Sequence, residues 1–213
     1  RSACRKRHTD HNRSRRARGA ETVMDTGSVI HARIEVDDAC LRRWPLPQPD
    51  ADGDKEQRGR VLVIAGSREM PGALILAANA ALNAGAGKLT VATAASVARL
   101  VATALPEARV IELAETDAGG IDRSAVERGR ELLAHVDAVL IGPGMQDEPA
   151  VCDFCAQVLD HPSTSVLVLD AAAMGVVLDS APRVEKFSNA TILTPHAGEL
   201  AHLTGDDKEM VCA

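Results

Sequence analysis

From residue 60 onward, the chain alternates short apolar runs with longer, Ala-rich stretches of helical periodicity. The apolar runs span residues 61–65, 88–93, 108–113, 138–142, 165–170 and 190–194. The helical stretches span residues 73–84, 95–102, 124–133, 149–159, 172–178 and 198–203. Runs that are apolar on both faces suit a parallel sheet that is covered by helices. The alternation therefore predicts an α/β fold of three layers, α/β/α, around a mainly parallel central sheet.

The beginning of the chain is strongly basic. Residues 1–20 hold eight of the 24 Lys and Arg residues and one acid, Asp10, so we expect a disordered tail over residues 1–23. Dense positive charge would suit a nucleic-acid arm or a transit segment. Because the chain does not begin with Met, a natural start at Met24 with spurious translation before it is the favoured interpretation.

An arm and a single domain are predicted after the tail. Residues 44–60 are rich in Pro, Gly and charge, which predicts that residues 24–59 form an extended N-terminal arm. The α/β domain is then predicted to span residues 60–213.

The composition argues against several classes of function. The chain has no Tyr, one Trp and two Phe, too few for the stacking surface of a single-strand nucleic-acid binder. No apolar run approaches the roughly 18 to 20 residues that cross a bilayer, and no apolar signal region is present, which predicts a cytoplasmic protein without membrane contact. Five scattered cysteines predict free thiols, and Cys152 and Cys155 are interpreted as helix packing because no second ligand pair completes a zinc site.

Ligands of an open α/β sheet bind at the carboxyl ends of its strands, so the loops after the apolar runs are the first candidates. Gly66 and Gly72 flank the first loop, where backbone amides can approach a ligand at a helix N-terminus. Arg68 occupies the middle glycine position of G-x-G-x-x-G, which excludes that fingerprint. NAGAGKLT lacks the first glycine of a P-loop, so Gly85 and Gly87 are interpreted as a helix stop and tight turn.

Three later loops combine tight turns with polar side chains. IGPGM places Gly142 and Gly144 in a narrow turn that can press its backbone against a sugar or pyrophosphate. LVLDAAAM carries Asp170, which can hold a hydroxyl or a metal ion or cap the next helix, and position alone favours capping. TPHAGEL groups His196 and Glu199 in one strand-to-helix turn, whereas the other six histidines are interpreted as surface residues. Their convergence on one sheet edge favours a functional site.

Four segments, in this order and spacing, resemble the ADP-dependent (S)-NAD(P)H-hydrate dehydratases of the ribokinase-like superfamily: GRVLVIAGSREMPGALILAANAALNAGAGKLTVAT, IGPGM, LVLDAAAM and ILTPHAGEL. The similarity covers about residues 36–205, and TPHAGE separates this family from most sugar kinases. The resemblance implies a ribokinase-like lyase in which ADP or ATP, with Mg²⁺, drives loss of water from the S form of hydrated NADH or NADPH. The ring hydroxyl would be activated by phosphoryl transfer and would leave as phosphate.

The resemblance also implies roles for individual residues. By motif, Ala73, Gly142 or Gly144, and His196 would contact the hydrated dinucleotide. The implied partners are this small-molecule substrate and, functionally, an NAD(P)H-hydrate epimerase, while a homo-oligomer is left open.

Supporting roles are assigned to Gly66, Asp170 and Glu199, with Asp170 as a polar or Mg²⁺-linked residue. No metal site made of protein ligands alone is predicted, because Ala172 stands where many relatives carry a second acid.

The family pattern normally continues with a Lys-Gly strand for the adenine nucleotide and a glycine-rich loop that supplies an anion hole and the catalytic Asp. We therefore expect the fold to lack its C-terminal part, the catalytic residue to lie beyond Ala213, and this chain by itself to be catalytically impaired. Two alternatives are a ribokinase-like kinase of a vitamin precursor or sugar, and an inactive binding module whose basic tail contacts nucleic acid.

Overall fold

The computed structural model describes residues 36–45, 48, 54, 55, 57–178 and 191–212. The chain divides into two compact units, residues 1–48 and residues 49–213. The predicted disordered tail and much of the predicted arm lie outside the described residues. Within the described part of the chain, no helix is long and apolar enough to span a membrane.

The first unit contains the helix α2 (Asp38–Arg43). The Asp37 carboxylate caps it by accepting a hydrogen bond from the backbone N–H of Cys40 at 2.7 Å. An acidic first turn and a basic last turn complement the helix dipole. The prediction of an extended arm is therefore wrong over these residues.

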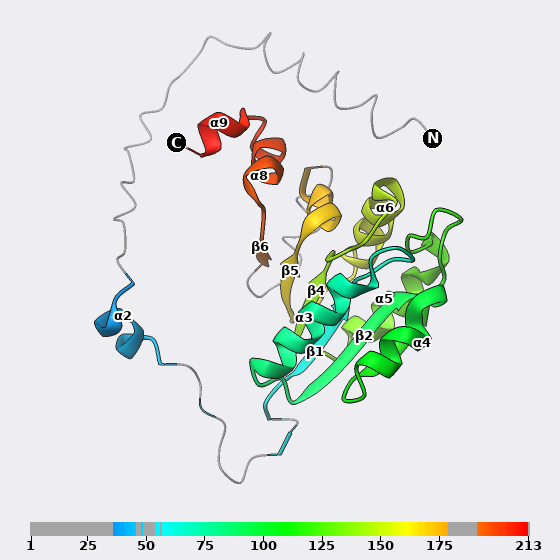
Figure 1. Ribbon diagram of the computed structural model, residues 1–213, viewed down its shortest axis with the longest axis horizontal. Helices are drawn as coiled ribbons and strands as arrows, with labels where there is room; N and C mark the ends of the chain where they lie inside the picture. Colours follow the sequence, from blue (N-terminus) through cyan, green and yellow to red (C-terminus); the bar gives the residue numbers. More distant parts are fainter. Residues whose placement is uncertain (1–35, 46–47, 49–53, 56, 179–190, 213) are drawn as a thin grey trace. The chain divides into compact units, whose positions relative to one another are not determined.

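In the described part of the second unit, six strands form a parallel sheet (Figure 1). The strands are β1 (Arg60–Ile64), β2 (Lys88–Ala94), β3 (Arg109–Leu113), β4 (Ala138–Ile141), β5 (Val166–Leu169) and β6 (Thr191–Leu193). Their order is β3-β2-β1-β4-β5-β6, so the chain first runs outward from β1 and then returns to place β4 on the other side of β1. The switch point of the topology lies between β1 and β4. The predicted parallel α/β sheet is confirmed.

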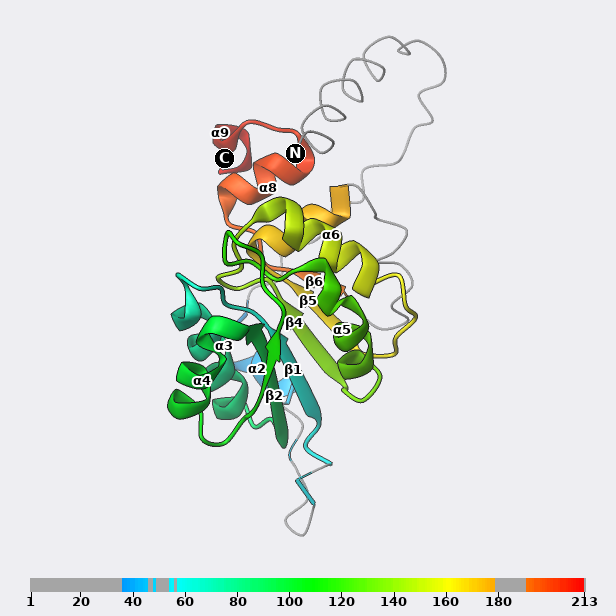
Figure 2. The ribbon, with the colours of Figure 1, turned by 90° about the vertical axis from the view of Figure 1, so that its right-hand side faces the viewer.

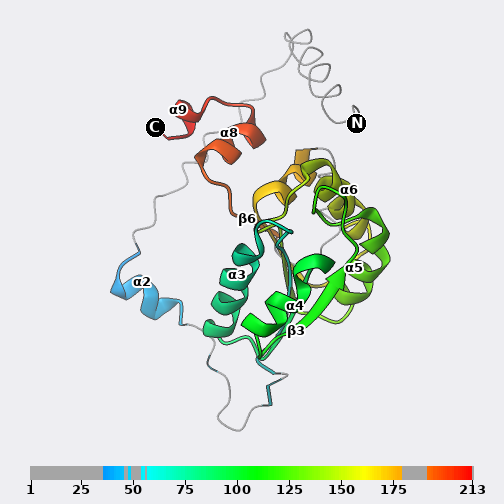
Figure 3. The ribbon, with the colours of Figure 1, turned by 45° about the vertical axis from the view of Figure 1, so that its right-hand side comes forward.

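Helices cover both faces of the sheet, which confirms the three predicted layers (Figures 2 and 3). One face is covered by α3 (Pro71–Asn83) and α4 (Ala95–Ala104). The other face is covered by the short 3₁₀ helices η1 (Arg123–Ala125) and η2 (Ala171–Met174), with α5 (Val126–Leu133) and α6 (Glu148–Val158). After β6 come α8 (Ala197–Thr204) and α9 (Lys208–Val211), where the sequence predicted a helix and then a polar tail.

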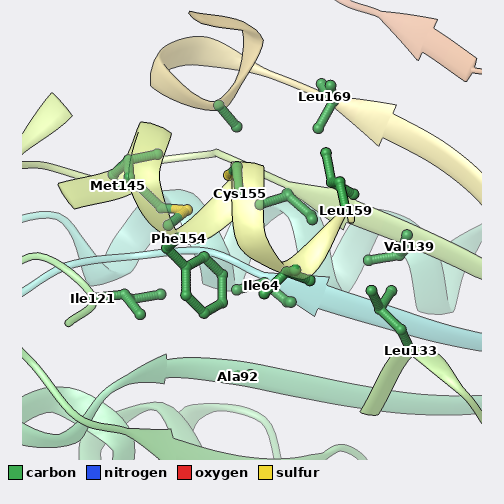
Figure 4. Packing of buried hydrophobic residues seen from close by; sticks show 14 of the residues in the cluster. Ile64, Ala92, Ile121, Leu133, Val139, Met145, Phe154, Cys155, Leu159 and Leu169 are labelled. Carbon is green, nitrogen blue, oxygen red and sulfur yellow. The ribbon is translucent and has the colours of Figure 1, made fainter. Parts of the chain in front are cut away.

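The larger core cluster lies between the sheet and α6 (Figure 4). Phe154 is fully buried there, and Ile121 and Met145 from two loops at the sheet edge belong to the same cluster. Cys155 is also fully buried, and burial raises the pKa of its thiol. The interpretation of the C-x-x-C as helix packing is confirmed, since both cysteines lie within α6 and Cys155 belongs to the core cluster.

Candidate functional site

Two loops meet at the switch point of the sheet: the β1 loop, residues 66–70, and the β4 loop, residues 142–147. Backbone hydrogen bonds join them, because the Gly66 N–H donates to the Pro143 carbonyl at 2.8 Å. The Gly142 N–H donates to the carbonyl of Ile64, at the end of β1, at 3.1 Å. The loops are thus held as one backbone surface at the carboxyl ends of β1 and β4.

The predicted glycines are required by how closely the chain approaches them. Gly142 has φ 128°, and an added Cβ would lie 1.9 Å from the Asp170 carbonyl oxygen. Gly144 has φ 68°, and its Cβ would lie 2.7 Å from the Ala73 Cβ. Gly66 has φ 77° and approaches Thr93 in the same way. The structure therefore brings Gly66, Gly142, Gly144 and Ala73 together, while their contact with a ligand stays a prediction.

Asp170 follows β5 and lies at the start of η2, but its side chain does not cap that helix. Instead, the Thr194 hydroxyl lies 2.7 Å from Asp170 Oδ1. The capping interpretation that position favoured is wrong, because the loop after the neighbouring strand supplies a hydroxyl partner that no local pattern reveals. The Asp170 carboxylate is therefore directed toward the loop after β6.

His196 and Glu199 form a reciprocal capping box at the start of α8. The His196 Nδ1 accepts hydrogen bonds from the N–H groups of Gly198 at 3.0 Å and Glu199 at 3.2 Å, which leaves the proton on Nε2. In return, the Glu199 carboxylate accepts from the His196 N–H at 2.8 Å. The glutamate three residues after the histidine was the signal that could have revealed this box in the sequence.

The His196 side chain is nevertheless 74% exposed, so its ring remains accessible. It borders a cavity of about 340 Å³ between η2, α8 and the N-terminus of α6. The lining residues are Glu148, Ala171, Ala172, Met174, Gly175, His196, Gly198, Glu199, His202 and Leu203. Two ionisable lining residues were not expected at a site: Glu148, and His202, which had been interpreted as a surface residue.

The predicted site residues thus form two groups on one sheet edge. Gly66, Gly142, Gly144 and Ala73 lie at the switch point, whereas His196 and Glu199 line the cavity. Asp170 lies between them, with its carbonyl against Gly142 and its carboxylate against Thr194. Ala171, next to Asp170, has φ 47° although it is not glycine, a conformation that costs about 1–3 kcal/mol and clusters at functional sites.

Polar side chains that sequence reasoning missed hold the β1 loop in place. Ser67 is fully buried and its Oγ donates to Gln146 Oε1 at 2.8 Å. Gln146 Nε2 in turn donates to Glu69 Oε2 at 3.1 Å. The partners lie 79 and 77 residues apart in the chain, so no local pattern announces them.

A metal ion would need ligands from outside the protein at this site. Among the residues that the structure describes, no three His, Cys, Asp or Glu side chains are grouped to hold one. Mg²⁺ is commonly bound by one or two carboxylates together with substrate phosphates and waters, and the Asp170 carboxylate fits that mode.

Comparison with known proteins identifies close relatives. The model of a family described as NAD(P)H-hydrate dehydratase matches residues 61–210. The ADP-dependent (S)-NAD(P)H-hydrate dehydratase of Xanthomonas campestris is 49% identical over 173 residues, which cover 81% of this chain and 57% of that protein. The bifunctional NAD(P)H-hydrate repair enzyme Nnr of Moorella thermoacetica is 38% identical over 202 residues, which cover 86% of this chain and 38% of that protein.

Solved structures agree with this similarity. The ADP/ATP-dependent NAD(P)H-hydrate dehydratase of Bacillus subtilis, co-crystallised with ATP and Mg²⁺, matches with a TM-score of 0.61 and 28% identity over 80% of this chain and 56% of that chain. A ribokinase-like superfamily protein of Enterococcus faecalis matches with a TM-score of 0.62 and 26% identity over 76% of this chain and 54% of that chain. The chain spans about half the length of these solved relatives.

Proposed function

Because the chain belongs to the NAD(P)H-hydrate dehydratase family, we propose that it takes part in nicotinamide nucleotide repair, the ADP-dependent dehydration of the S form of hydrated NADH or NADPH. The observation that carries the proposal is the meeting of the β1 loop, the β4 loop and the Asp170–Thr194 pair on one sheet edge. Open α/β sheets bind nucleotides at this place.

In the proposed complex, the switch-point loops bind the dinucleotide through their backbone. Gly144 approaches Ala73 so closely that no side chain fits at position 144. The first turn of α3 also has no side-chain cap. Its N–H groups are therefore available to a phosphate, which the helix dipole also favours. This suits a pyrophosphate better than a neutral sugar.

The nucleotide and Mg²⁺ would be bound on the Asp170 side of the site. When bound, ADP or ATP supplies the phosphoryl chemistry that turns the ring hydroxyl into a leaving group. Asp170, oriented by Thr194, would hold a water or an ion near the phosphates, and His196 would contact the dinucleotide. We assign these residues to binding and orientation, which is the main contribution a protein makes to phosphoryl transfer.

Relatives named bifunctional repair enzymes support a functional link to an epimerase activity. We propose that the protein acts on the S form that such an epimerase would supply, and that it does so in the cytoplasm.

The direct test is restoration of reduced-nicotinamide absorbance from chemically hydrated NADH, with ADP and Mg²⁺, alongside equilibrium binding of hydrated NADH. We expect binding by this chain and competition by NADH. Absence of binding, with binding by the Xanthomonas relative in parallel, would contradict the proposal. Phosphorylation of a stable vitamin or sugar hydroxyl with ATP would favour the alternative kinase.

Two variants of His196 separate its two roles. His196→Asn keeps an N-cap acceptor but removes the ring, so the free energy of unfolding should stay within about 0.5 kcal/mol. His196→Ala removes both and should cost about 1 kcal/mol. Affinity for hydrated NADH should fall in both variants. Retained affinity in His196→Asn would mean that the histidine is only a helix cap.

A further inference from the structure

A hairpin at residues 115–121 connects β3 to η1 and reaches both switch-point loops. An antiparallel bridge pairs Glu115 with Ile121, and the Thr116 N–H donates to the Gly120 carbonyl at 2.8 Å. Ile121 is fully buried in the core cluster, as is nearly all of Leu113 just before the hairpin. The base of this hairpin, called here the β3 hairpin, is therefore fixed to the core.

One side of the β3 hairpin contacts the β1 loop through Arg68. The Arg68 guanidinium forms an ion pair with the Glu115 carboxylate and donates to the Asp117 carbonyl at 3.0 Å. The backbone N–H of Arg68 donates to the Gly119 carbonyl at 3.2 Å. An added Cβ at Gly119 would lie 2.8 Å from the Arg68 Cβ, so the two segments are in close contact.

The other side of the β3 hairpin contacts the β4 loop. The Thr116 hydroxyl donates to Asp147 Oδ2 at 2.8 Å. An added Cβ at Gly120 would lie 2.5 Å from the Gln146 carbonyl oxygen. The β3 hairpin therefore contacts both loops that flank the switch point, and the two sets of contacts are independent of each other.

Glu115 also has a second anchor. Its other carboxylate oxygen accepts a hydrogen bond from the Ser96 N–H, in the first turn of α4, at 2.9 Å. The hydrogen bond from Arg68, followed by that from Ser96, lowers the pKa of Glu115 to about 2. The carboxylate is thus charged at any pH at which an enzyme of this kind is assayed.

We propose that the β3 hairpin is a brace that sets the positions of both switch-point loops for ligand binding, with Glu115 acting through Arg68 on the β1 loop and Thr116 acting through Asp147 on the β4 loop. The ligand part of this inference rests on the proposed function. Neither residue is assigned a contact with the substrate, so both are positioning residues.

The side chains of this brace lie outside the core. The Arg68 side chain is 46% exposed, and neither Glu115 nor Thr116 belongs to a core cluster. Removing their contacts should therefore loosen the loops while the sheet and its helices stay folded.

The test compares Glu115→Gln and Thr116→Val with a matched control, Glu131→Gln. Glu131 forms an exposed ion pair with Arg128 within α5, at 2.7 Å. In the ligand-free protein, amide hydrogen exchange of residues 66–70 should rise about tenfold in Glu115→Gln. Exchange of residues 142–147 should rise in Thr116→Val, and the control should match the parent protein in both segments.

Affinity provides the second readout. The dissociation constant for hydrated NADH should rise about tenfold in Glu115→Gln, because small displacements of binding groups are costly, and should be unchanged in Glu131→Gln. If Glu115 acts through Arg68, Arg68→Gln and the double variant should lose no more affinity than Glu115→Gln alone.

Unchanged amide hydrogen exchange of residues 66–70 in Glu115→Gln would overturn the brace. Faster exchange with unchanged affinity for hydrated NADH would overturn it as well. Failure of the parent protein to bind hydrated NADH would count against the proposed function alone, because the exchange data on ligand-free protein decide the brace separately.

Discussion

At the scale of single residues, Gly142 is constrained both by its backbone angle and by a close backbone neighbour. Its φ of 128° is unfavourable for a side chain, and an added Cβ would lie 1.9 Å from a backbone oxygen that cannot rotate away. We expect Gly142→Ala to lower the free energy of unfolding by about 2 kcal/mol or more, measured by urea denaturation.

Gly72→Ala is the matched control for this prediction. Gly72 lies in the first turn of α3 with no atom within 4 Å of its added Cβ. Its substitution should change the free energy of unfolding by less than about 1 kcal/mol, because alanine has a higher helix propensity than glycine. Equal losses in the two variants would mean that the close approach at Gly142 is relieved by local movement.

The Glu115–Arg68 pair predicts a pH dependence with a definite sign. The folded-state pKa of Glu115 is about 2, below the ordinary 4.5. The pair therefore stabilises the fold fully above about pH 4.5, and the stabilisation is lost as the pH falls through 2. The groups that face this carboxylate are Arg68 and the Ser96 N–H, while Asp117 and Glu69 lie near Arg68.

Urea denaturation of Glu115→Gln and the parent protein at two pH values isolates this effect, because other carboxylates titrate alike in both. The stability difference should be present at pH 7 and should shrink toward pH 2. A difference that is the same at both values would show that charge is not its source.

At the scale of secondary-structure elements, the strands, the helix stop and the loops at the sheet edge could be predicted, because local sequence patterns determine them. Each of the six apolar runs became a strand, because residues apolar on both faces can be buried only between two helical layers. Gly85, with φ 100°, follows the end of α3 as the predicted helix stop. The loops at the sheet edge were located correctly for the same reason.

The sequence could not reveal what depends on distant partners. Position alone favoured a cap for Asp170, because its partner Thr194 lies 24 residues away and local reasoning cannot detect it. The β3 hairpin was overlooked because its partner Arg68 lies 47 residues earlier. In contrast, α2 carried a local signal in the capping Asp37, which the Pro- and Gly-rich composition of the following segment outweighed.

Cys155, within α6, and Cys212, which follows α9, should differ sharply in reactivity. Cys155 is fully buried, and burial raises the pKa of its thiol, so little thiolate is present at neutral pH. A thiol reagent at pH 8 should modify the exposed Cys212 quickly and Cys155 only after unfolding. Mass spectrometry of the labelled peptides measures this, and rapid native labelling of Cys155 would contradict the packing of α6.

At the scale of the whole molecule, the two core clusters lie entirely within the second unit. A variant that begins at Pro49 should therefore retain a cooperative unfolding transition, with a midpoint within a few degrees of the parent protein. Circular dichroism on heating measures this. A broad transition, or loss of helical signal beyond that of α2, would show that the first unit helps to hold the sheet.

The backbone surface that the β1 and β4 loops form at the switch point limits how mutation can change ligand preference. Gly142 and Gly144 lie against the carbonyl oxygens of Asp170 and Met70, and these backbone groups are the same whatever side chains the gene encodes. A point mutation can disrupt such a backbone surface but cannot give it a new ligand preference. A laboratory selection for altered choice between NADH and NADPH should therefore recover substitutions in the cavity lining, at positions such as Glu148, where side chains form the surface.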